Sequence, residues 1–373
     1  MPAFGTYREA VAWRKSNGDR KLLPLVVLLS GAAALAACSA VSSSRQPQPG
    51  QAAAATSPVT GAGGVPASSA GTAIAVRIAS PGTSPLPAPT ALRPFTGTAA
   101  FAGLGAWQPA GRLVAGQPAV YETLLVPPGD TKRAGIAWMD TSQLSARLYS
   151  GSLSPGGGPY KYTAPVAPSA ASSLVAAFNG GFQMKDAHGG YYTEGRMVRP
   201  LVPGAASLVI YANGSVTVGA WGSDVTMTPS VVAVRQNLFP LVVNGKPSAR
   251  ASTRTWHVWG GTCPCGPGLH GSKYQWRSGL GVTANGALVY VVGPVLDPVQ
   301  VADLLVRAGV VRGMELDINP TWPVFASFKP TAPDGLAAPS NGARLTNTSR
   351  GPATFFDPAY ARDFITMSAR PGR

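Results

Sequence analysis

Short runs in which apolar and polar residues alternate recur along the chain from about residue 93 onward, and they predict a β-rich domain. Residues 134–140 (AGIAWMD) and 146–151 (ARLYSG) read as short strands, and residues 207–221 (SLVIYANGSVTVGAW) read as two strands around an Asn-Gly turn. Asn-Gly favours a type I′ hairpin, because both central residues need positive φ. Three antiparallel hairpins are therefore expected, at Asn213-Gly214, Asn244-Gly245 and Asn285-Gly286.

One segment near the C-terminus carries a helical pattern instead. Asp297 can cap a helix that begins with Pro298, continues through an apolar face and stops at Gly309. The apolar runs 288–293 (LVYVVG) and 313–319 (GMELDIN) flank this helix, so they are expected to be parallel strands that lie close together. The predicted fold class is α+β: a β-rich single domain with antiparallel hairpins and a C-terminal strand–helix–strand unit.

The first 38 residues have the layout of a secretory leader. Four basic residues precede the apolar run 22–38, which ends in Leu-Ala-Ala-Cys and resembles a bacterial lipobox. We expect cleavage before Cys38 and lipidation of its sulfur. A transmembrane anchor and simple cleavage at a small-residue site are the alternatives. Each of them places the rest of the chain outside the cytoplasm, and the first two hold it at the cell membrane.

Residues 39–92 consist mostly of Ala, Ser, Pro, Gly and Thr. This composition buries too little apolar surface to offset its ordering entropy, so the segment is predicted to be a disordered tether. The domain is then expected to span residues 93–373.

The chain is strongly basic, with a formal net charge of +15 from 30 basic and 15 acidic residues. A charge of this size is compatible with binding to nucleic acid or to an anionic surface. The basic residues are scattered along the sequence, however, and no basic run is interleaved with aromatic residues. Nucleic acid is therefore not expected as a partner.

After Cys38 the chain has two cysteines, Cys263 and Cys265, separated by one proline. A local disulfide is the first interpretation, because an oxidising compartment permits it. Together with His257 and His270 the cysteines could instead hold a metal, although the spacing differs from that of common zinc sites. Free thiols are the third interpretation. No other cofactor is predicted.

Glu315 and Asp317 lie two residues apart in an apolar stretch of an acid-poor chain. On a regular strand they would share one face, with Cα atoms roughly 6.5–7 Å apart. Two like charges resist joint ionisation when they are buried, which favours a functional site at the carboxyl end of this strand. An ion pair with Arg277 or Arg312, or a loop-capping role for Asp317, is the alternative.

The order of several segments between about residues 130 and 370 resembles the phosphodiester glycosidase family. The similar stretches are "AGIAWMDTSQLSARLYSG", the Asn-Gly-Gly-Phe motif in "VAAFNGGFQ", the hairpin at Asn213-Gly214, "LVVNGKP", "WRSGLGVTANGALVYVV" and the strand "MELDIN". The resemblance implies an extracytoplasmic hydrolase that cleaves a sugar from a phosphate-linked glycoconjugate.

The resemblance also implies roles for particular residues. Arg277 would hold the anionic phosphate with its planar guanidinium. Asp317, together with Glu315 or Glu194, would supply the acid and the carboxylate of glycosidic cleavage. The substrate-binding candidates are the motif residues Asn179, Gly180 and Gly181, the loop residue His188 in the insert 183–196, and Asn319.

The chain departs from the family pattern after Asp317, where Ile318-Asn319-Pro320 stands in place of glycines. This change leaves two other functions open. One is a glycan-binding module without catalytic activity, and the other is a structural envelope lipoprotein.

Overall fold

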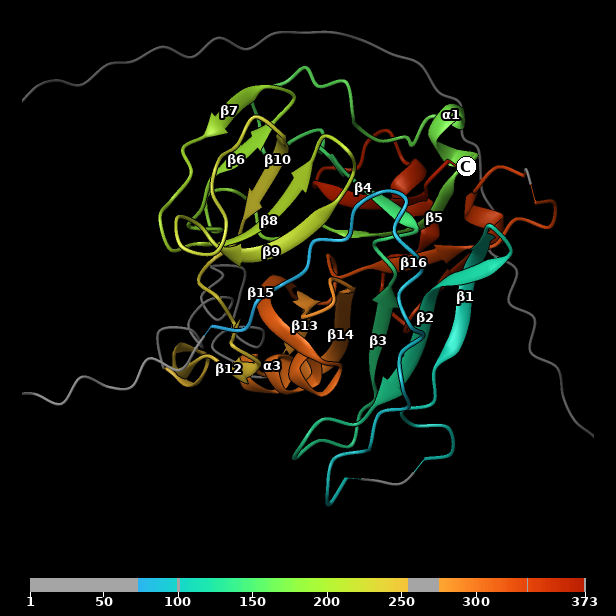
Figure 1. Cartoon of the computed structure of the whole chain (residues 1–373), viewed down its shortest axis with the longest axis vertical. Helices are drawn as coiled ribbons and strands as arrows, with labels where there is room; N and C mark the ends of the chain where they lie inside the picture. The colour runs from blue at the N-terminus through green and yellow to red at the C-terminus, as the bar shows by residue number, and fades with distance from the viewer. Residues whose placement is uncertain (1–72, 99–100, 254–274, 334, 372–373) are drawn as a thin grey trace, which may run out of the picture. The chain divides into compact units, whose positions relative to one another are not determined.

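The computed structural model describes residues 73–98, 101–253, 275–333 and 335–371. This part of the chain is mostly β-structure in antiparallel sheets, which confirms the β-rich, antiparallel part of the predicted fold (Figure 1). Helices contribute less than an α+β assignment implies. The α-helices of the described residues are α1 (Pro168–Ala171) and α3 (Pro298–Arg307).

The largest sheet has eight strands and holds the strand that carries Glu315 and Asp317. Its order is β1-β2-β3-β14-β13-β15-β11-β12. The strand bounds are β1 Gln108–Val114, β2 Gln117–Leu125, β3 Ala134–Met139, β14 Leu288–Leu296, β13 Gln275–Thr283, β15 Val310–Ile318, β11 Val242–Val243 and β12 Lys246–Pro247.

Two further sheets have five strands each. The first has the order β7-β6-β10-β8-β9, with bounds β7 Arg196–Arg199, β6 Tyr191–Thr193, β10 Val231–Gln236, β8 Ala206–Tyr211 and β9 Val216–Ala220. The second has the order β17-β16-β5-β18-β4, with bounds β17 Gly342–Arg344, β16 Phe325–Phe328, β5 Leu174–Asn179, β18 Phe364–Ala369 and β4 Leu144–Tyr149. Side chains from all three sheets share one buried core, which includes Tyr290, Leu316, Leu208 and Phe178.

The three Asn-Gly dipeptides all connect antiparallel strands, as predicted. Their turns differ. At Asn244-Gly245 both residues have positive φ, 48° and 69°, as a type I′ turn requires. At the other two sites the glycine alone has positive φ. Asn213 instead accepts a hydrogen bond from the backbone N–H of Ser215, so its side chain stabilises the turn in another way.

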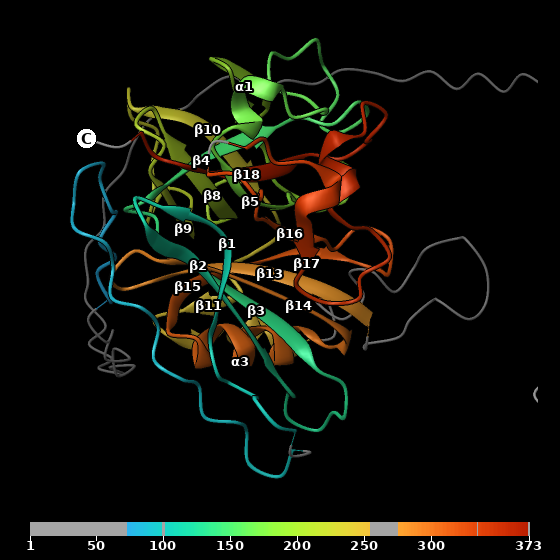
Figure 2. The same cartoon turned by 90° about the vertical axis from the view of Figure 1, so that its right-hand side faces the viewer.

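Helix α3 begins and ends where the sequence predicts. The Asp297 side chain accepts a hydrogen bond from the Gln300 N–H, the Gln300 side chain reaches back to the Asp297 N–H, and Pro298 opens the helix. Gly309 follows the helix with φ 86°. The apolar face of α3 packs against β13, β14 and β15 (Figure 2).

The strands on either side of α3 run in the same direction, as predicted, but they are not direct neighbours. Strand β13 lies between β14 and β15 and pairs antiparallel with each of them. The carboxyl end of β15, where Asp317 and Ile318 lie, therefore adjoins the start of β13 at Arg277.

Residues 73–92 differ from the disordered tether expected there. Their backbone forms hydrogen bonds to the domain, from Arg77 N–H to the Ala284 carbonyl (2.9 Å) and from Leu92 N–H to the Gly105 carbonyl (2.9 Å). The Leu86 N–H donates to the Asp140 carboxylate (3.0 Å). Backbone pairing of this kind does not depend on apolar side chains, so composition gives no indication of it. Residues 39–72 lie outside the described part.

No helix among the described residues is both long enough and apolar enough to cross a membrane.

Candidate active site

A β-bulge near the end of β15 decides where its two carboxylates point. Gly279 on β13 pairs with Glu315, but Arg277, two residues earlier on β13, pairs with Ile318, three residues later on β15. The extra residue brings Ile318, instead of Asp317, to the position opposite Arg277. The strand is therefore not regular here, and the expected common face of Glu315 and Asp317 is lost. Bulges commonly redirect side chains beside functional sites.

The hydroxyl of Ser278 stabilises this bulge. Its Oγ accepts a hydrogen bond from the Asp317 N–H (3.1 Å) and lies 3.2 Å from the Asp317 carbonyl oxygen, to which it can donate. The Asn179 side-chain amide donates to the same Oγ (3.1 Å). The Asn237 side chain donates to the Glu315 and Leu316 carbonyls. Side chains thus satisfy backbone groups that the irregular ladder would leave unpaired in a buried place.

Glu315 forms a sealed ion pair with Arg277. Its Oε1 lies 2.5 Å from Arg277 Nη1, and both side chains are completely buried. Arg277 Nε donates to the Leu296 carbonyl (2.8 Å). This is the alternative interpretation of Glu315, an ion pair with Arg277. It differs from the roles that the resemblance implies, in which Arg277 holds a phosphate and Glu315 takes part in cleavage. Arg312, the other expected partner, pairs with Asp224 instead.

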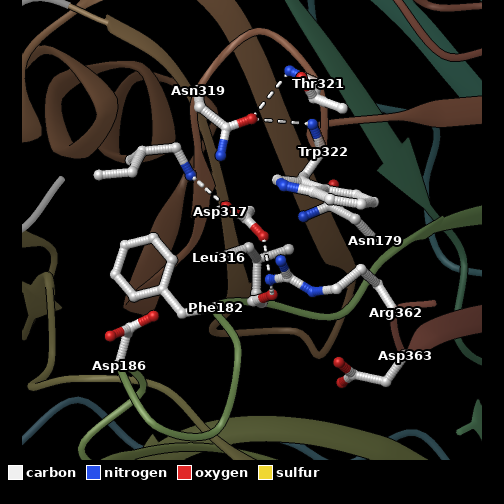
Figure 3. Close-up of polar contacts among 12 residues, drawn as sticks. Asn179, Phe182, Asp186, Leu316, Asp317, Asn319, Thr321, Trp322, Arg362 and Asp363 are labelled. Carbon is white, nitrogen blue, oxygen red and sulfur yellow. Dashed lines mark hydrogen bonds and ion pairs between the residues drawn. The ribbon is translucent and has the colours of Figure 1, made fainter. Parts of the chain in front are cut away.

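Asp317 pairs with a different arginine, Arg362, which lies two residues before the first residue of β18. Arg362 Nη2 lies 2.5 Å from Asp317 Oδ2 and 2.5 Å from the Gly181 carbonyl oxygen (Figure 3). Asp317 Oδ1 accepts a hydrogen bond from the Ile318 N–H (2.8 Å). The expected pairing of Asp317 with Arg277 does not occur.

The environment of Asp317 makes it a candidate proton carrier. Burial raises the pKa of this carboxyl group to about 7, although the Arg362 charge and the Ile318 N–H act in the opposite direction. A carboxyl group with a pKa near neutrality can give or take a proton under ordinary conditions. Asp317 is 2% exposed, so contact with a substrate requires a rearrangement of the residues that cover it.

Three buried hydrogen-bond donors around Trp322 find no acceptor among the described residues, and one of them belongs to Arg362, the partner of Asp317. They are Nε of Arg362, Nε of Arg350 and the hydroxyl of Tyr360. All three surround the indole of Trp322: the two guanidinium carbons lie 4.9 and 4.6 Å from its ring, and the Tyr360 ring lies 6.3 Å away. Buried donors without acceptors are unfavourable, and an anionic oxygen would satisfy them. We call Asp317, Trp322, Arg350, Tyr360 and Arg362 the Asp317 site.

Asn319 borders the Asp317 site in a strained conformation. Its φ of 113° lies in the region that favours glycine. Its side-chain oxygen accepts hydrogen bonds from the Thr321 and Trp322 N–H groups (2.8 and 3.1 Å), so it shapes the loop that presents Trp322 (Figure 3). The backbone of Asn319 thus has a conformation that glycine adopts easily, although the residue is an asparagine.

The Asn179-Gly180-Gly181 motif lies next to the site but serves the packing around it. The Asn179 oxygen accepts hydrogen bonds from the Tyr290 hydroxyl (2.8 Å) and the Val324 N–H (3.1 Å), and its amide bonds Ser278. A Cβ at Gly180 would lie 2.2 Å from Asp363 Oδ2, and one at Gly181 would lie 3.0 Å from Arg235 Nη2. The glycines therefore make room for the buried Arg235–Asp363 ion pair (2.8 Å).

Glu194 and His188 do not belong to the Asp317 site. Glu194 lies in the turn between β6 and β7, where its two oxygens accept the Lys161 and Tyr162 N–H groups, each at 3.0 Å. His188 is exposed in the loop after Phe182, with a φ of 47°. No hydrogen bond or ion pair found in the described ranges joins either residue to Asp317.

Several predicted features involve cysteines and possible metal ligands. Cys38 and the leader, and Cys263 and Cys265 with their flanking histidines, lie outside the described residues. In the part that is described, no group of three or more His, Cys, Asp or Glu side chains could hold a metal ion. A cavity of about 290 Å³ lies elsewhere, between residues 78–80 and the β8–β9 hairpin.

Sequence reasoning missed Arg362, Arg350 and Tyr360. The strongest available signal was the Arg362-Asp363 pair directly before an apolar strand. Each member forms a buried ion pair, Arg362 with Asp317 and Asp363 with Arg235. Arg362 lies 45 residues beyond Asp317, so no local spacing connects the two.

Comparison with known proteins supports the resemblance seen in the sequence. Residues 172–317 match the family model of phosphodiester glycosidases, which confirms the resemblance over that stretch. The match contains Asn179, Arg277, Glu315 and Asp317 and ends before Arg362. A search of curated protein sequences finds no match.

Three solved structures are similar in part. The catalytic domain of zebrafish N-acetylglucosamine-1-phosphodiester alpha-N-acetylglucosaminidase is 15% identical, with a TM-score of 0.44 over 71% of this chain and 88% of that one. A hypothetical protein from Synechocystis is 11% identical (TM-score 0.38; 70% and 64% covered). An exported protein from Burkholderia pseudomallei is 12% identical (TM-score 0.35; 65% and 75% covered).

Proposed function

We propose that this domain, which carries a phosphodiester glycosidase match over residues 172–317, hydrolyses the bond between a sugar and a phosphate at the Asp317 site. The observation that carries the proposal is the buried Asp317, with a pKa of about 7, together with the three buried donors around Trp322 that lack acceptors. The Asp317 carboxyl group can transfer a proton near neutral pH, and the three donors can form hydrogen bonds to an anionic phosphate.

The proposed reaction uses Asp317 twice. Protonated Asp317 donates its proton to the oxygen that bridges sugar and phosphate while the anomeric carbon–oxygen bond breaks. Water then adds to the anomeric carbon, and the Asp317 carboxylate takes up the proton that the water loses. The products are a free sugar and a phosphate monoester. The Arg362 guanidinium stabilises the charge on the departing phosphate.

One carboxyl group can suffice for this chemistry. Glycosidases that cleave sugar–sugar bonds commonly use two carboxyl groups. A phosphate leaves more easily, because it is a stable anion whose second pKa is near 6. The sealed Glu315–Arg277 pair therefore does not argue against hydrolysis, since the second carboxylate is not required.

A glycan-binding module without turnover is the second candidate. It is favoured by the loop after Asp317, where Ile318 and Pro320 stand at positions for which the resemblance implies glycines. A bulkier loop could admit a ligand to Trp322 while keeping its reactive bond away from Asp317.

The proposal is tested by a hydrolysis screen over sugars linked through C1 to a phosphodiester, with release of reducing sugar as the readout. Asp317→Asn should lower turnover about a hundredfold to ten-thousandfold, the usual contribution of a general acid. Turnover of the wild type should fall as pH rises through about 7, because Asp317 then loses its proton. Asp186→Asn is the matched control, since Asp186 is an exposed carboxylate in the loop after Phe182.

Two results would contradict the proposal: full turnover by Asp317→Asn, or binding of these compounds by the wild type without any hydrolysis. The second result would favour the binding module.

The proposal includes a location outside the cytoplasm with anchoring at the membrane, supported by the leader that ends in Leu-Ala-Ala-Cys38. Equal labelling of the wild type and Cys38→Ser by a fatty-acid probe would contradict anchoring through Cys38.

A further inference from the structure

A basic and aromatic surface forms where three separate segments meet. Arg147 comes from β4, Tyr160, Lys161 and Tyr162 come from the loop between β4 and α1, and Arg196 and Arg199 come from β7. The four cationic side chains belong to exposed residues, and the two tyrosines are partly buried. We call these six residues the Tyr160–Tyr162 patch. The sequence does not reveal the patch, because its members are spread over more than fifty positions of the chain.

The cations and the rings of the patch are stacked. The Arg147 guanidinium carbon lies 4.1 Å from the centre of the Tyr162 ring, and Lys161 Nζ lies 5.3 Å from the same ring. The Arg196 guanidinium carbon lies 4.8 Å from the Tyr160 ring. Stacking holds long basic side chains in defined positions, so less conformational entropy is lost when they bind an anion.

Positive charge dominates the patch. The neighbouring carboxylate, Glu194, accepts hydrogen bonds from the backbone N–H groups of Lys161 and Tyr162. The Arg196 guanidinium donates hydrogen bonds to the carbonyls of Gly157 and Pro159 in the loop. Arg147, Lys161 and Arg199 form no ion pair with a carboxylate among the described residues. Three exposed cations thus remain available for an anionic partner.

The patch is continuous with the segment that carries Arg362. The N–H groups of Ser152 and Ser154 donate to the Tyr360 and Ala361 carbonyls, at 3.0 and 2.9 Å. The Tyr149 ring contacts Tyr162 on one side and stacks on Phe364 on the other. A ligand chain whose end lies in the Asp317 site could therefore continue over the patch.

We propose that the Tyr160–Tyr162 patch binds a polymeric, phosphate-bearing glycan, so that the substrate class is a polyanionic chain and not a small glycosyl phosphodiester alone. Guanidinium groups match phosphate oxygens, and stacked tyrosines offer an apolar edge to sugar rings. The choice of a glycan rests on the proposed function. Binding to the patch is measured without turnover, so the two proposals can fail separately.

The test measures binding of the full-length protein to a poly(glycerol phosphate) chain that bears sugar substituents, at low and at high salt. Neutral dextran, a single-stranded oligothymidylate and phosphatidylglycerol vesicles are the comparison probes. The patch variant is Arg147→Gln/Lys161→Gln/Arg199→Gln, which removes no side-chain hydrogen bond found in the structure. The matched control removes the same charges from exposed residues outside the patch, as Arg77→Gln/Lys132→Gln/Arg133→Gln.

The wild type and the control variant should bind the glycan phosphate polymer in a salt-sensitive manner, and the patch variant should bind about tenfold more weakly. Dextran should not bind. Equal binding by the patch and control variants would overturn the proposal. So would tighter binding of the oligothymidylate or of the vesicles than of the glycan polymer, because the partner would then be a nucleic acid or a lipid surface.

Discussion

Glu315 and Asp317 are two carboxylates on one strand, two residues apart, and each pairs with a buried arginine at 2.5 Å. Their surroundings differ. Glu315 and Arg277 are completely buried, and Arg277 also donates to the Leu296 carbonyl of β14, whereas Arg362 lies with buried donors that lack acceptors around Trp322. A single inserted residue in β15 separates the two pairs. The comparison teaches that two ion pairs of the same length can lie in different surroundings, so distance alone does not identify the carboxylate that is the better candidate for catalysis.

The difference follows from what surrounds each charge. Burial of Asp317 outweighs its ion pair with Arg362 and its hydrogen bond from the Ile318 N–H, so its pKa rises to about 7. Strongly perturbed pKa values of this kind cluster at functional sites.

The largest effect on stability is expected from Glu315→Gln. Removing this charge takes away the carboxylate that pairs with the buried Arg277, which costs about 3–5 kcal/mol. The melting temperature should fall by roughly 10 °C for a domain of this size. Asp317→Asn should shift it much less at neutral pH, because Asp317 is already partly protonated there. Thermal melts of the two variants measure both shifts in melting temperature. Equal shifts would show that the Glu315–Arg277 and Asp317–Arg362 pairs contribute alike to stability.

A smaller effect is expected from Ser278→Ala, which removes the hydroxyl that stabilises the bulge. The Asp317 N–H and the Asn179 amide lose an acceptor, at a cost of about 1–3 kcal/mol. Ser207→Ala is the matched control, because Ser207 is also buried and its hydroxyl bonds the Ala205 carbonyl and the Gln236 side chain.

Both serine variants should unfold at lower denaturant concentration than the wild type. Only Ser278→Ala should also lower turnover at the Asp317 site, since it alone loosens the backbone that directs Asp317. Equal turnover of the two variants would show that the bulge does not position this carboxyl group.

The parts of this molecule that sequence could predict depend on local chemistry. Asp297, Pro298 and Gly309 determine the start and end of α3 through hydrogen bonds and backbone angles within a few residues of each other. The Asn-Gly turns are local in the same sense. Glu315 and Asp317 were recognisable because charge is rare in an apolar strand.

The partners of these residues could not be predicted, because they depend on packing between distant strands. Arg277 reaches Glu315 across the sheet, and Arg362 reaches Asp317 from the start of β18. The bulge that assigns each carboxylate its partner arises from the pairing of β13 with β15, and the β15 sequence contains no glycine at the bulge that would indicate it. The order of residues 73–92 rests on backbone hydrogen bonds to distant loops.

The most direct test of the account is a titration of Asp317 by infrared spectroscopy. The carbonyl band of a protonated carboxyl group should be present at pH 5 and disappear at higher pH with a midpoint near 7. This band should be absent from Asp317→Asn and present in Glu315→Gln examined below its melting temperature. A band that is also missing from Glu315→Gln, or a wild type with no carboxyl group titrating near pH 7, would contradict the assignment of Asp317 as the proton carrier.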